Sequence, residues 1–170
     1  MSAEQVSPDE SVRSAIEADL AELVRLAEAA VGEKREQKGG PVWVRREARR
    51  DPAVSLSAAL AADDHEVVAG LLDDAVVGYG VAHDEVLADG GRLGVVDDLY
   101  VEPGAREVGL GEELMNHLVA WCEQRGCFGV DSLALPGDRS TKNFFESFGL
   151  VARAIVVHRR LQAGDDSTAS

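Results

Sequence analysis

The sequence predicts an α/β (α+β) protein in which strands and helices alternate along the chain. Two observations carry this prediction. Strand-like and helix-like patterns of apolar residues alternate over the 170 residues, and one strand leads through a glycine-bearing loop into an amphipathic helix. A chain of this length fits one domain of ordinary size. We expect the domain to span residues 11–162, with flexible ends at 1–10 and 163–170, because both ends are rich in small and polar residues.

The first part of the domain is predicted to contain one strand and three helices. Asp19 suits the cap of the first helix. Two breaks that contain proline, Gly39-Gly40-Pro41 and Asp51-Pro52, separate the helices from one another. The predicted elements are a strand at residues 11–15 and helices at 19–31, 43–50 and 55–61.

The second part is predicted to be rich in strands. The Asp73-Asp74 pair favours a tight turn between two of them, Asp138 can cap a short helix, and Gly149 can end that helix. The predicted strands lie at residues 66–72, 75–82, 92–101, 130–135 and 151–161, and the predicted helices at 112–124 and 138–147.

The most informative stretch runs from Val95 to Glu113. A strand ends near Val101, a Pro-Gly turn follows, and a loop with Gly109 and Gly111 leads into a helix. Backbone N–H groups at a helix start lack partners within the helix, and the helix dipole attracts anions to them. Because glycine has no Cβ, a phosphate can approach the main chain closely here. The stretch therefore predicts an anion site, and we expect the pyrophosphate of a cofactor.

The form of the loop separates the candidate cofactors. The dinucleotide fingerprint G-x-G-x-x-G is absent, because Arg106 and Glu107 occupy the positions of its first glycines. The P-loop pattern is absent because Glu112 follows Gly111. The residues match R/Q-x-x-G-x-G/A at Arg106, Gly109 and Gly111. This is the pyrophosphate loop of the GNAT superfamily of acyl-CoA N-acyltransferases. The chain resembles that superfamily over almost its whole length, because the order of its predicted elements is also the GNAT order.

The resemblance implies the GNAT fold, a mixed, centrally splayed sheet flanked by helices. In that fold the strands at residues 92–101 and 130–135 separate, and the acyl-pantetheine arm lies between them. It also implies an acyl-CoA-dependent N-acyltransferase that uses acetyl-CoA, with direct attack by the acceptor amine. Cys122 and Cys127 are then not needed as nucleophiles, and their spacing suits neither a redox pair nor a zinc site. The resemblance assigns cofactor binding to Leu99, Tyr100, Val101, Arg106, Glu107, Val108, Gly109, Leu110, Gly111, Glu112, Asp138, Asn143 and Phe145.

Two adjacent carboxylates, Asp97 and Asp98, are the candidates for binding or deprotonating the amine. The sequence D-D-L-Y-V is similar to the E-D-F-F-V of diamine acetyltransferases, which favours a primary amine as acceptor. Consecutive residues of a strand point to opposite faces, so we expect only one of the two to face the acceptor cavity. We slightly favour Asp97, because Leu99 and Val101 share its parity.

The short helix near the C-terminus departs from the family pattern. Phe145 occupies the position of the tyrosine that usually acts as general acid, and Asp138 replaces the usual asparagine. A phenyl ring has no hydroxyl proton to donate. Three interpretations follow. The thiolate leaves unassisted or takes its proton from water, or Tyr79, Tyr100 or Ser140 supplies the proton, or the domain binds acyl-CoA without efficient turnover.

The charge of the chain limits the classes of partner that it can bind. The formal net charge of −14 disfavours nucleic acid, which needs clustered Lys and Arg to neutralise phosphates. The acidic stretch at residues 61–104 either attracts a cationic substrate or serves to keep the protein soluble. The basic cluster at residues 34–50 instead favours an anionic acceptor, such as an amino-acid carboxylate. The chain shows neither a membrane-spanning segment nor a secretory signal, and its four histidines are scattered singly. We expect a cytoplasmic protein without a metal.

The leading prediction is therefore an N-acetyltransferase that acts on a small-molecule amine or a protein amine. The alternative is a non-catalytic or regulatory module that binds acyl-CoA, and the missing tyrosine is its main support. A protein acetyltransferase is favoured if the acceptor site is an open groove rather than a closed pocket. A homodimer is left open.

Overall fold

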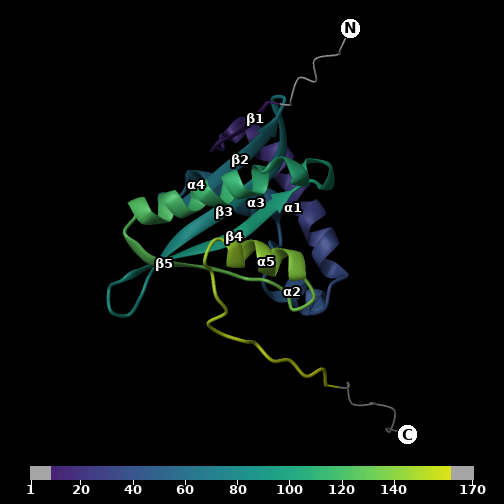
Figure 1. Cartoon of the computed structure of the whole chain (residues 1–170), viewed down its shortest axis with the longest axis vertical. Helices are drawn as coiled ribbons and strands as arrows, with labels where there is room; N and C mark the ends of the chain where they lie inside the picture. Colours follow the sequence, from purple (N-terminus) through teal and green to yellow (C-terminus); the bar gives the residue numbers. More distant parts are fainter. Residues whose placement is uncertain (1–8, 162–170) are drawn as a thin grey trace, which may run out of the picture.

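The computed structural model describes residues 9–161 and shows one five-stranded sheet with helices on both faces (Figure 1). The strands follow the order β1-β2-β3-β4-β5 across the sheet. The strands are β1 (Glu10–Ser14), β2 (His65–Leu72), β3 (Ala75–Val86), β4 (Arg92–Val101) and β5 (Cys127–Ser132). The helices are α1 (Leu20–Arg35), α2 (Gly40–Arg46), α3 (Pro52–Ala61), α4 (Leu110–Gln124) and α5 (Arg139–Ser147), with 3-10 turns η1 (Glu17–Asp19) and η2 (Pro103–Val108).

The sheet is mixed, as predicted. Strands β1 to β4 pair antiparallel, and β5 pairs parallel to β4. The hairpin between β2 and β3 turns at Asp73 and Asp74, which both have positive φ angles, 48° and 66°. Positive φ at both central residues is typical of a tight hairpin turn whose twist matches that of the strands. The predicted turn is therefore confirmed.

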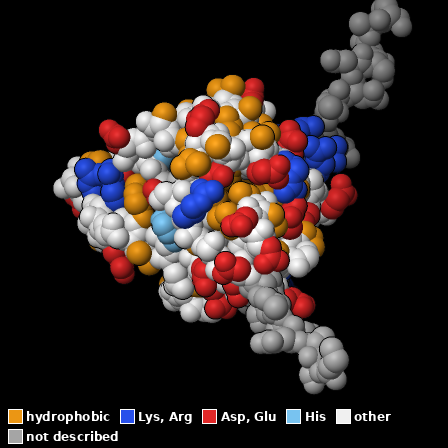
Figure 2. Space-filling view, turned by 90° about the horizontal axis from the view of Figure 1, so that it is seen from above, with side chains coloured by type: hydrophobic (Ala, Val, Ile, Leu, Met, Phe, Trp, Pro, Cys, Tyr) orange, Lys and Arg blue, Asp and Glu red, His pale blue; other side chains and the backbone are white. Residues whose placement is uncertain are grey.

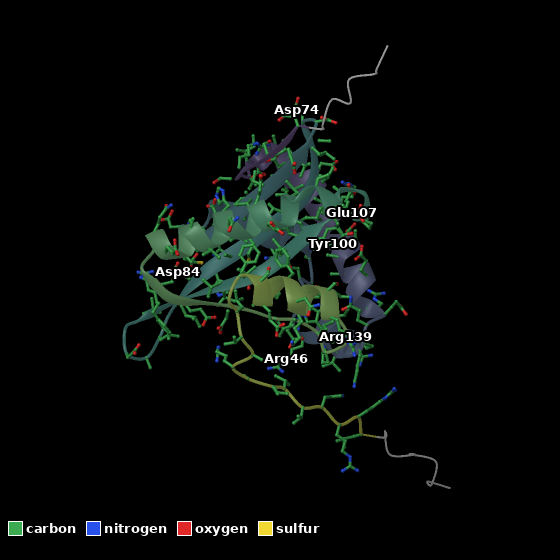
Figure 3. All side chains as sticks on the ribbon, viewed as in Figure 1. Arg46, Asp74, Asp84, Tyr100, Glu107 and Arg139 are labelled. Atoms are coloured by element: carbon green, nitrogen blue, oxygen red, sulfur yellow. The ribbon has the colours of Figure 1, made fainter. Side chains whose placement is uncertain are left out.

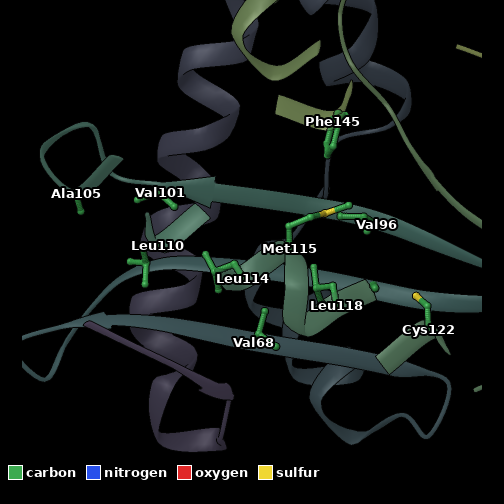
Figure 4. Close-up of a cluster of buried hydrophobic side chains, with 11 residues drawn as sticks. Val68, Val96, Val101, Ala105, Leu110, Leu114, Met115, Leu118, Cys122 and Phe145 are labelled. Carbon is green, nitrogen blue, oxygen red and sulfur yellow. The ribbon is translucent and has the colours of Figure 1, made fainter. Parts of the chain in front are cut away.

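Two hydrophobic cores lie on opposite faces of the sheet. Helix α4 covers one face with a single apolar stripe, and α1 and α3 cover the other. Figure 4 shows the α4-side cluster, in which the stripe points at the strands. The stripe consists of Leu110, Leu114, Met115, Leu118 and Cys122, at the spacing of one helix face.

Strands β4 and β5 stay together over only part of their length. Their pairing runs from Arg92 opposite Cys127 to Val96 opposite Ser132, and residues 97–101 of β4 continue without a partner on β5. At the paired end, the buried carboxylate of Asp84 in β3 binds Arg92 and also Arg125, which follows α4. The sheet is thus closed at one end and opens toward the other, as the predicted splayed sheet requires.

Several elements differ from the sequence-based prediction. Helices α2 and α3 begin earlier than expected, because Pro41 and Pro52 occupy their first turn instead of separating them from the preceding chain. Strand β5 spans 127–132 rather than 130–135. The predicted final strand at residues 151–161 is wrong for this structure, because that segment has no regular secondary structure and is exposed. Within residues 9–161 it pairs with none of the five strands.

Close packing between β4 and α4 yields a prediction about stability. A Cβ added at Gly94 would lie 2.4 Å from Sγ and 3.0 Å from Cβ of Cys122, too close for either atom. Gly94→Ala should therefore lower the free energy of unfolding by about 1–3 kcal/mol, the usual cost of overpacking a core. Gly129→Ala on β5 is the matched control, because its Cβ would meet only Leu93 at 3.8 Å. Urea denaturation of both variants measures the difference, and equal midpoints would contradict the packing argument.

Candidate active site

The predicted anion loop lies between the open end of β4 and the first turn of α4. Gly109 is the N-cap of α4 and has a φ of +88°, a conformation that glycine adopts without strain. A Cβ at Gly109 would project into open space, and one at Gly111 would touch only ordinary neighbours, the nearest being the Phe144 ring at 3.7 Å. Leu110 between them is fully buried and anchors the loop in the core. The main chain here is therefore open to an approaching phosphate.

Arg106 connects this loop to β4 and α1. Its Nε donates to the carbonyl of Val101 at 2.8 Å, and its guanidinium forms a salt bridge with Glu33 at 2.7 Å. The hydroxyl of Tyr100 donates to the same carboxylate at 2.8 Å. Burial acts to raise the pKa of Glu33, but the hydrogen bonds from Arg106 and Tyr100 outweigh it and lower that pKa. Glu33, which the sequence analysis did not single out, is therefore the residue that fixes Arg106.

The arrangement limits what Tyr100 can do. Burial, together with the Glu33 carboxylate, raises the pKa of Tyr100 to about 12, and its proton is already shared with Glu33. Figure 3 shows Tyr100 at the end of the sheet near Glu107, far from Asp84 at the closed end. Tyr100 thus acts as a support for the loop in this structure, rather than as a free proton donor.

A β-bulge decides the orientation of the two candidate carboxylates. Val81 of β3 lies opposite Asp98, but the next residue, Ala82, lies opposite Val96, so Asp97 is an extra residue in β4. A bulge of this kind breaks the alternation of side chains along the strand. Asp97 and Asp98 therefore both lie on the α1/α3 face of the sheet, since Asp97 contacts His83 and Asp98 lines a cavity beside α1.

The expectation that the two carboxylates face opposite ways, with Asp97 turned inward, is wrong. Asp98 is the one that lines the cavity. Its Oδ2 accepts a hydrogen bond from Nε of Arg49 at 2.5 Å, and both side chains are largely buried. Val101 still packs against α4, because the alternation is regular again after the bulge. The sequence carries no visible signal for the extra residue.

The cavity itself is narrow and carries charged groups of both signs. Its volume is about 10 Å³, room for roughly one water molecule. Lys34 lies over the ring of Trp43, with Nζ 4.6 Å from the ring centroid, and burial lowers the pKa of this lysine. The lining residues are Ala27, Ala30, Val31, Lys34, Trp43, Arg49, Tyr79, Asp98, Leu99 and Tyr100. The basic cluster of the sequence thus contributes Lys34 and Arg49 to the cavity.

Tyr79 also lines the cavity, and it is one of the three candidate proton donors named from the sequence. It is almost fully buried, and burial raises its pKa well above the ordinary value, with the charge of Asp98 acting in the same direction. Its hydroxyl therefore stays protonated across the neutral range. By contrast, the hydroxyl of Ser140, the other candidate donor, is hydrogen-bonded to Asp138 at 2.9 Å.

Two histidines that are far apart in the sequence meet beside Asp97. His65 and His83 lie opposite each other in the register of β2 and β3, and their rings stack with centroids 5.4 Å apart. Nδ1 of His83 lies 2.7 Å from Oδ2 of Asp97. Burial acts to lower the pKa of His83, but hydrogen bonds to Asp97 and Glu85 raise it overall, and burial raises the pKa of Asp97. The sequence analysis treated these histidines singly and missed the pairing.

Helix α5 borders the open side of β4. Asp138 caps the helix by accepting from the backbone N–H of Thr141 at 2.9 Å and from its hydroxyl at 2.6 Å. Burial acts to raise the pKa of Asp138, yet these hydrogen bonds lower it. Phe145 is buried and points from α5 toward the side of the sheet that holds Val96 and Met115 (Figure 4), whereas Asn143 is exposed.

The two cysteines are thiols in this structure. Cys122 is buried in the α4-side core, and burial raises its pKa to about 12. Burial also raises the pKa of Cys127. A thiol needs to lose its proton to act as a nucleophile, so neither side chain is suited to that role near neutrality.

A comparison with known families identifies the family of this chain. Residues 24–150 match the family described as "Acetyltransferase (GNAT) family". The chain belongs to the GNAT acetyltransferase family. Glucosamine 6-phosphate N-acetyltransferase 1 of Oryza sativa subsp. japonica is 34% identical over 113 residues, which cover 63% of this chain and 61% of that protein. The chain thus spans about three fifths of the length of this relative, which is not a diamine acetyltransferase.

Solved structures of the same fold are numerous. A tetramutant of the BH1408 protein from Bacillus halodurans superposes with a TM-score of 0.75 at 18% identity, over 89% of this chain and 99% of that one. An aminoglycoside acetyltransferase from an uncultured soil metagenomic sample, in complex with sisomicin, gives 0.67 at 22% identity, over 91% and 96%. An aminoglycoside N-acetyltransferase in complex with CoA has a TM-score of 0.68 at 15% identity, over 95% of this chain and 100% of that one.

No helix among residues 9–161 combines the length and apolarity needed to cross a bilayer.

The loop geometry yields a prediction about acetyl-CoA. Replacing Gly109 and Gly111 together with valine should abolish binding, because the new side chains would fill the space that a pyrophosphate needs. Gly104→Val is the matched control, since it adds the same bulk to the adjacent turn, where a Cβ meets no atom within 4 Å. Isothermal titration calorimetry measures the affinity, and circular dichroism checks the fold. Tight binding by the folded double variant would exclude the loop as the pyrophosphate site.

Proposed function

We propose that this protein transfers the acetyl group of acetyl-CoA to a primary amine on a small acceptor molecule. The observation that carries the proposal is the position of one carboxylate. Asp98 lies in a cavity on β4, on the strand that also leads to the glycine loop and has no partner on β5 beyond Val96. Strand β4 therefore carries the unpaired edge proposed for the cofactor and the carboxylate of Asp98, and it leads directly into the proposed anion loop.

The cofactor side of the proposal uses the main chain. The pyrophosphate would bind the backbone of residues 106–112 at the start of α4, where N–H groups and the helix dipole favour an anion. The pantetheine amides would pair with the backbone of Leu99 to Val101 on the side away from β3, in the manner of an added strand, and the Val101 carbonyl there also accepts from Arg106. Arg106 would position the loop through Glu33 and the Val101 carbonyl, and Phe145 would close the site from α5.

The acceptor side of the proposal uses Asp98. Its carboxylate would hold the ammonium form of the acceptor or take its proton, alone or through water. The amine nitrogen then forms a bond to the acetyl carbonyl carbon, and the carbon–sulfur bond breaks with its electron pair leaving on sulfur. The proton lost by the amine and the proton gained by the thiolate balance. Asp97, hydrogen-bonded to His83 on the same face, would tune this carboxylate rather than bind the substrate.

Among the possible proton donors for the thiolate, Tyr79 is the remaining candidate. Tyr100 and Ser140 already donate to Glu33 and Asp138. Tyr79 lines the cavity beside Asp98, but burial raises its pKa, so its hydroxyl holds its proton more tightly than an ordinary tyrosine does. Proton transfer from water remains the competing route, because a thiolate is a tolerable leaving group near neutrality.

The cavity also favours one class of acceptor. Lys34 and Arg49 bring two cationic groups to the wall, against the single carboxylate of Asp98. This arrangement suits an amine that also carries a phosphate or carboxylate, and it argues against a simple diamine. The sequence relative from rice is named for glucosamine 6-phosphate, an amine of this class.

A thiol-release assay with acetyl-CoA and an acceptor panel tests the function. The panel contains glucosamine 6-phosphate, glucosamine, putrescine and an aminoglycoside. We expect turnover with the phosphorylated amine and weaker turnover with the others. Lys34→Met should raise the KM for glucosamine 6-phosphate by about 10-fold, the loss of one charge-assisted hydrogen bond, and leave the KM for glucosamine unchanged. Cofactor binding without acceptor-dependent thiol release from any amine would support the non-catalytic module instead.

The two aspartates give a sharp contrast. Asp98→Asn should lower kcat/KM for the best acceptor by about 10- to 100-fold, because a hydrogen bond to a charged group is lost, while acetyl-CoA affinity stays intact. If Asp98 is the base, the pH–rate profile also loses its acidic limb. Asp97→Asn should change stability more than kinetics. Asp64→Asn, which removes an exposed carboxylate beside His65, is the control. Full activity of both the 97 and 98 variants would show that the amine is deprotonated before it binds.

Restoring the tyrosine hydroxyl at position 145 tests whether protonation of the thiolate limits turnover. If protonation of the thiolate limits turnover, Phe145→Tyr should raise kcat by up to about 10²-fold, the low end for a positioned acid. Tyr79→Phe should lower kcat if Tyr79 supplies the proton, and it retains the ring that packs in the core. Steady-state thiol release measures both. An unchanged rate in both variants would mean that protonation is not limiting or that water provides the proton.

A further inference from the structure

Three side chains that can ligate a metal come together from three neighbouring strands. His65 of β2, His83 of β3 and Asp97 of β4 each offer one ligand atom, and these atoms all lie within 4.8 Å of one another. Among residues 9–161, this is the one group of three such side chains that meets so closely. The expectation of a protein without a metal used the separation of the histidines along the chain, and folding removes that separation for His65 and His83.

The pairing of the strands places the three side chains on one face of the sheet. His65 lies directly opposite His83 in the antiparallel register, so both side chains point the same way. Val67 and Val81, two residues along each strand, pack in the core under α1 and α3, which assigns the histidines to that face. Asp97 joins them because the bulge makes it an extra residue in β4.

The donor set selects a class of metal ion. Two imidazoles and one carboxylate suit Zn²⁺ and other divalent first-row transition metals, whereas Mg²⁺ and Ca²⁺ prefer oxygen ligands alone. Three protein ligands also leave a coordination position for water. Ligand atoms on one zinc ion lie about 3.3–3.5 Å apart, so the three atoms need to close by at most about 1.5 Å. The side chains of His65 and His83 are 28% and 23% exposed, which leaves room for that rotation and a route for the ion.

Further carboxylates hold the other nitrogens of the two rings. Nδ1 of His65 lies 2.7 Å from Oδ1 of Asp64, which leaves Nε2 of His65 for a metal. Nε2 of His83 lies 3.3 Å from Oε1 of Glu85, and Nδ1 of His83 faces Oδ2 of Asp97 at 2.7 Å. His83 can therefore ligate through Nδ1 beside Asp97. A carboxylate on the second ring nitrogen is the usual support of a histidine that binds a metal, because it fixes the tautomer and the ring orientation.

The charge around the cluster favours a cation. Three carboxylates contact the two rings, so with neutral imidazoles the cluster is negative, and a divalent ion offsets most of that charge. The chain as a whole has a net charge of −14. On the face shown in Figure 2, acidic side chains are spread widely, and Lys and Arg occur in a few places. A field of this sign raises the local concentration of cations.

We infer that His65, His83 and Asp97 bind one divalent transition metal ion, with Zn²⁺ as the representative of the class. The ion joins β2, β3 and β4 at the bulge and holds Asp97 in its extra position. Neither histidine lines the cavity of Asp98, so this metal site and the acceptor pocket are separate. Metal binding can therefore be measured without acetyl-CoA or an acceptor, and its result does not depend on the proposed function.

Calorimetric titration of the metal-depleted full chain with Zn²⁺ tests the inference. At about pH 8, where imidazole is neutral, the wild type should bind one ion per chain. His65→Ala and His83→Ala should each weaken binding by about 100-fold or more, because losing a ligand costs at least as much as losing its outer partner. Asp64→Asn should weaken it by about 10- to 100-fold. His158→Ala is the matched control, since it removes an exposed histidine outside the cluster.

The spectrum of bound Co²⁺ identifies the ligands. Co²⁺ at the inferred site should show d–d bands without a sulfur-to-metal charge-transfer band, which a site at Cys127 would produce. Zinc should also raise the melting temperature of the wild type by about 5–10 °C at 100 times its dissociation constant, because only the folded chain brings the three strands together. The same addition should leave the melting temperature of His83→Ala unchanged.

The outcomes separate a built site from nonspecific binding. One ion per chain, lost in the two histidine variants and kept in His158→Ala, supports the inference. A wild type that binds no Zn²⁺, or that binds several ions weakly with no change in melting temperature, overturns it. Binding that survives in both histidine variants, with circular dichroism unchanged, also overturns it, because the ion then lies elsewhere.

Discussion

The early end of pairing between β4 and β5 is the constraint on which the rest of the structure depends. Two strands that remained paired to Val101 would satisfy the backbone of β4 and leave no edge for a ligand. Because pairing stops at Val96, the last part of β4 keeps free backbone groups at the place where the anion loop begins. The open edge of β4 beside the glycine loop follows from this one divergence.

The bulge at Asp97 is the second decisive feature. It turns two consecutive carboxylates to the same face and divides the work between them, since Asp98 meets Arg49 in the cavity and Asp97 meets His83 beside it. It also restores Val101 to the α4 side, so that the core under the cofactor edge stays apolar. One extra residue thus places two carboxylates on the α1/α3 face while Val101 stays on the apolar α4 face of the same strand.

The sequence predicts features that depend on residues close together in the chain, and it misses those that depend on contacts between distant segments. Helix α4, the Asp73-Asp74 turn and the cap at Asp138 follow from periodicity and turn chemistry, and the structure confirms them. The orientation of Asp97 depends on the pairing register with β3, which a single strand does not reveal. Glu33 and His65 enter the site region from other elements, far away in the sequence. Residues 151–161 have the apolar pattern of a strand but pair with none of the described strands.

The buried carboxylate of Asp84 has a mechanical consequence. By binding Arg92 at the start of β4 and Arg125 after α4, it fixes the narrow end of the wedge between β4 and β5. A wedge that is held at its apex moves least there and most at its mouth. A small change in the angle between the two strands would therefore shift the mouth of the wedge more than its apex, and the ion-pair network of Asp84 would limit that change from the far end of the sheet.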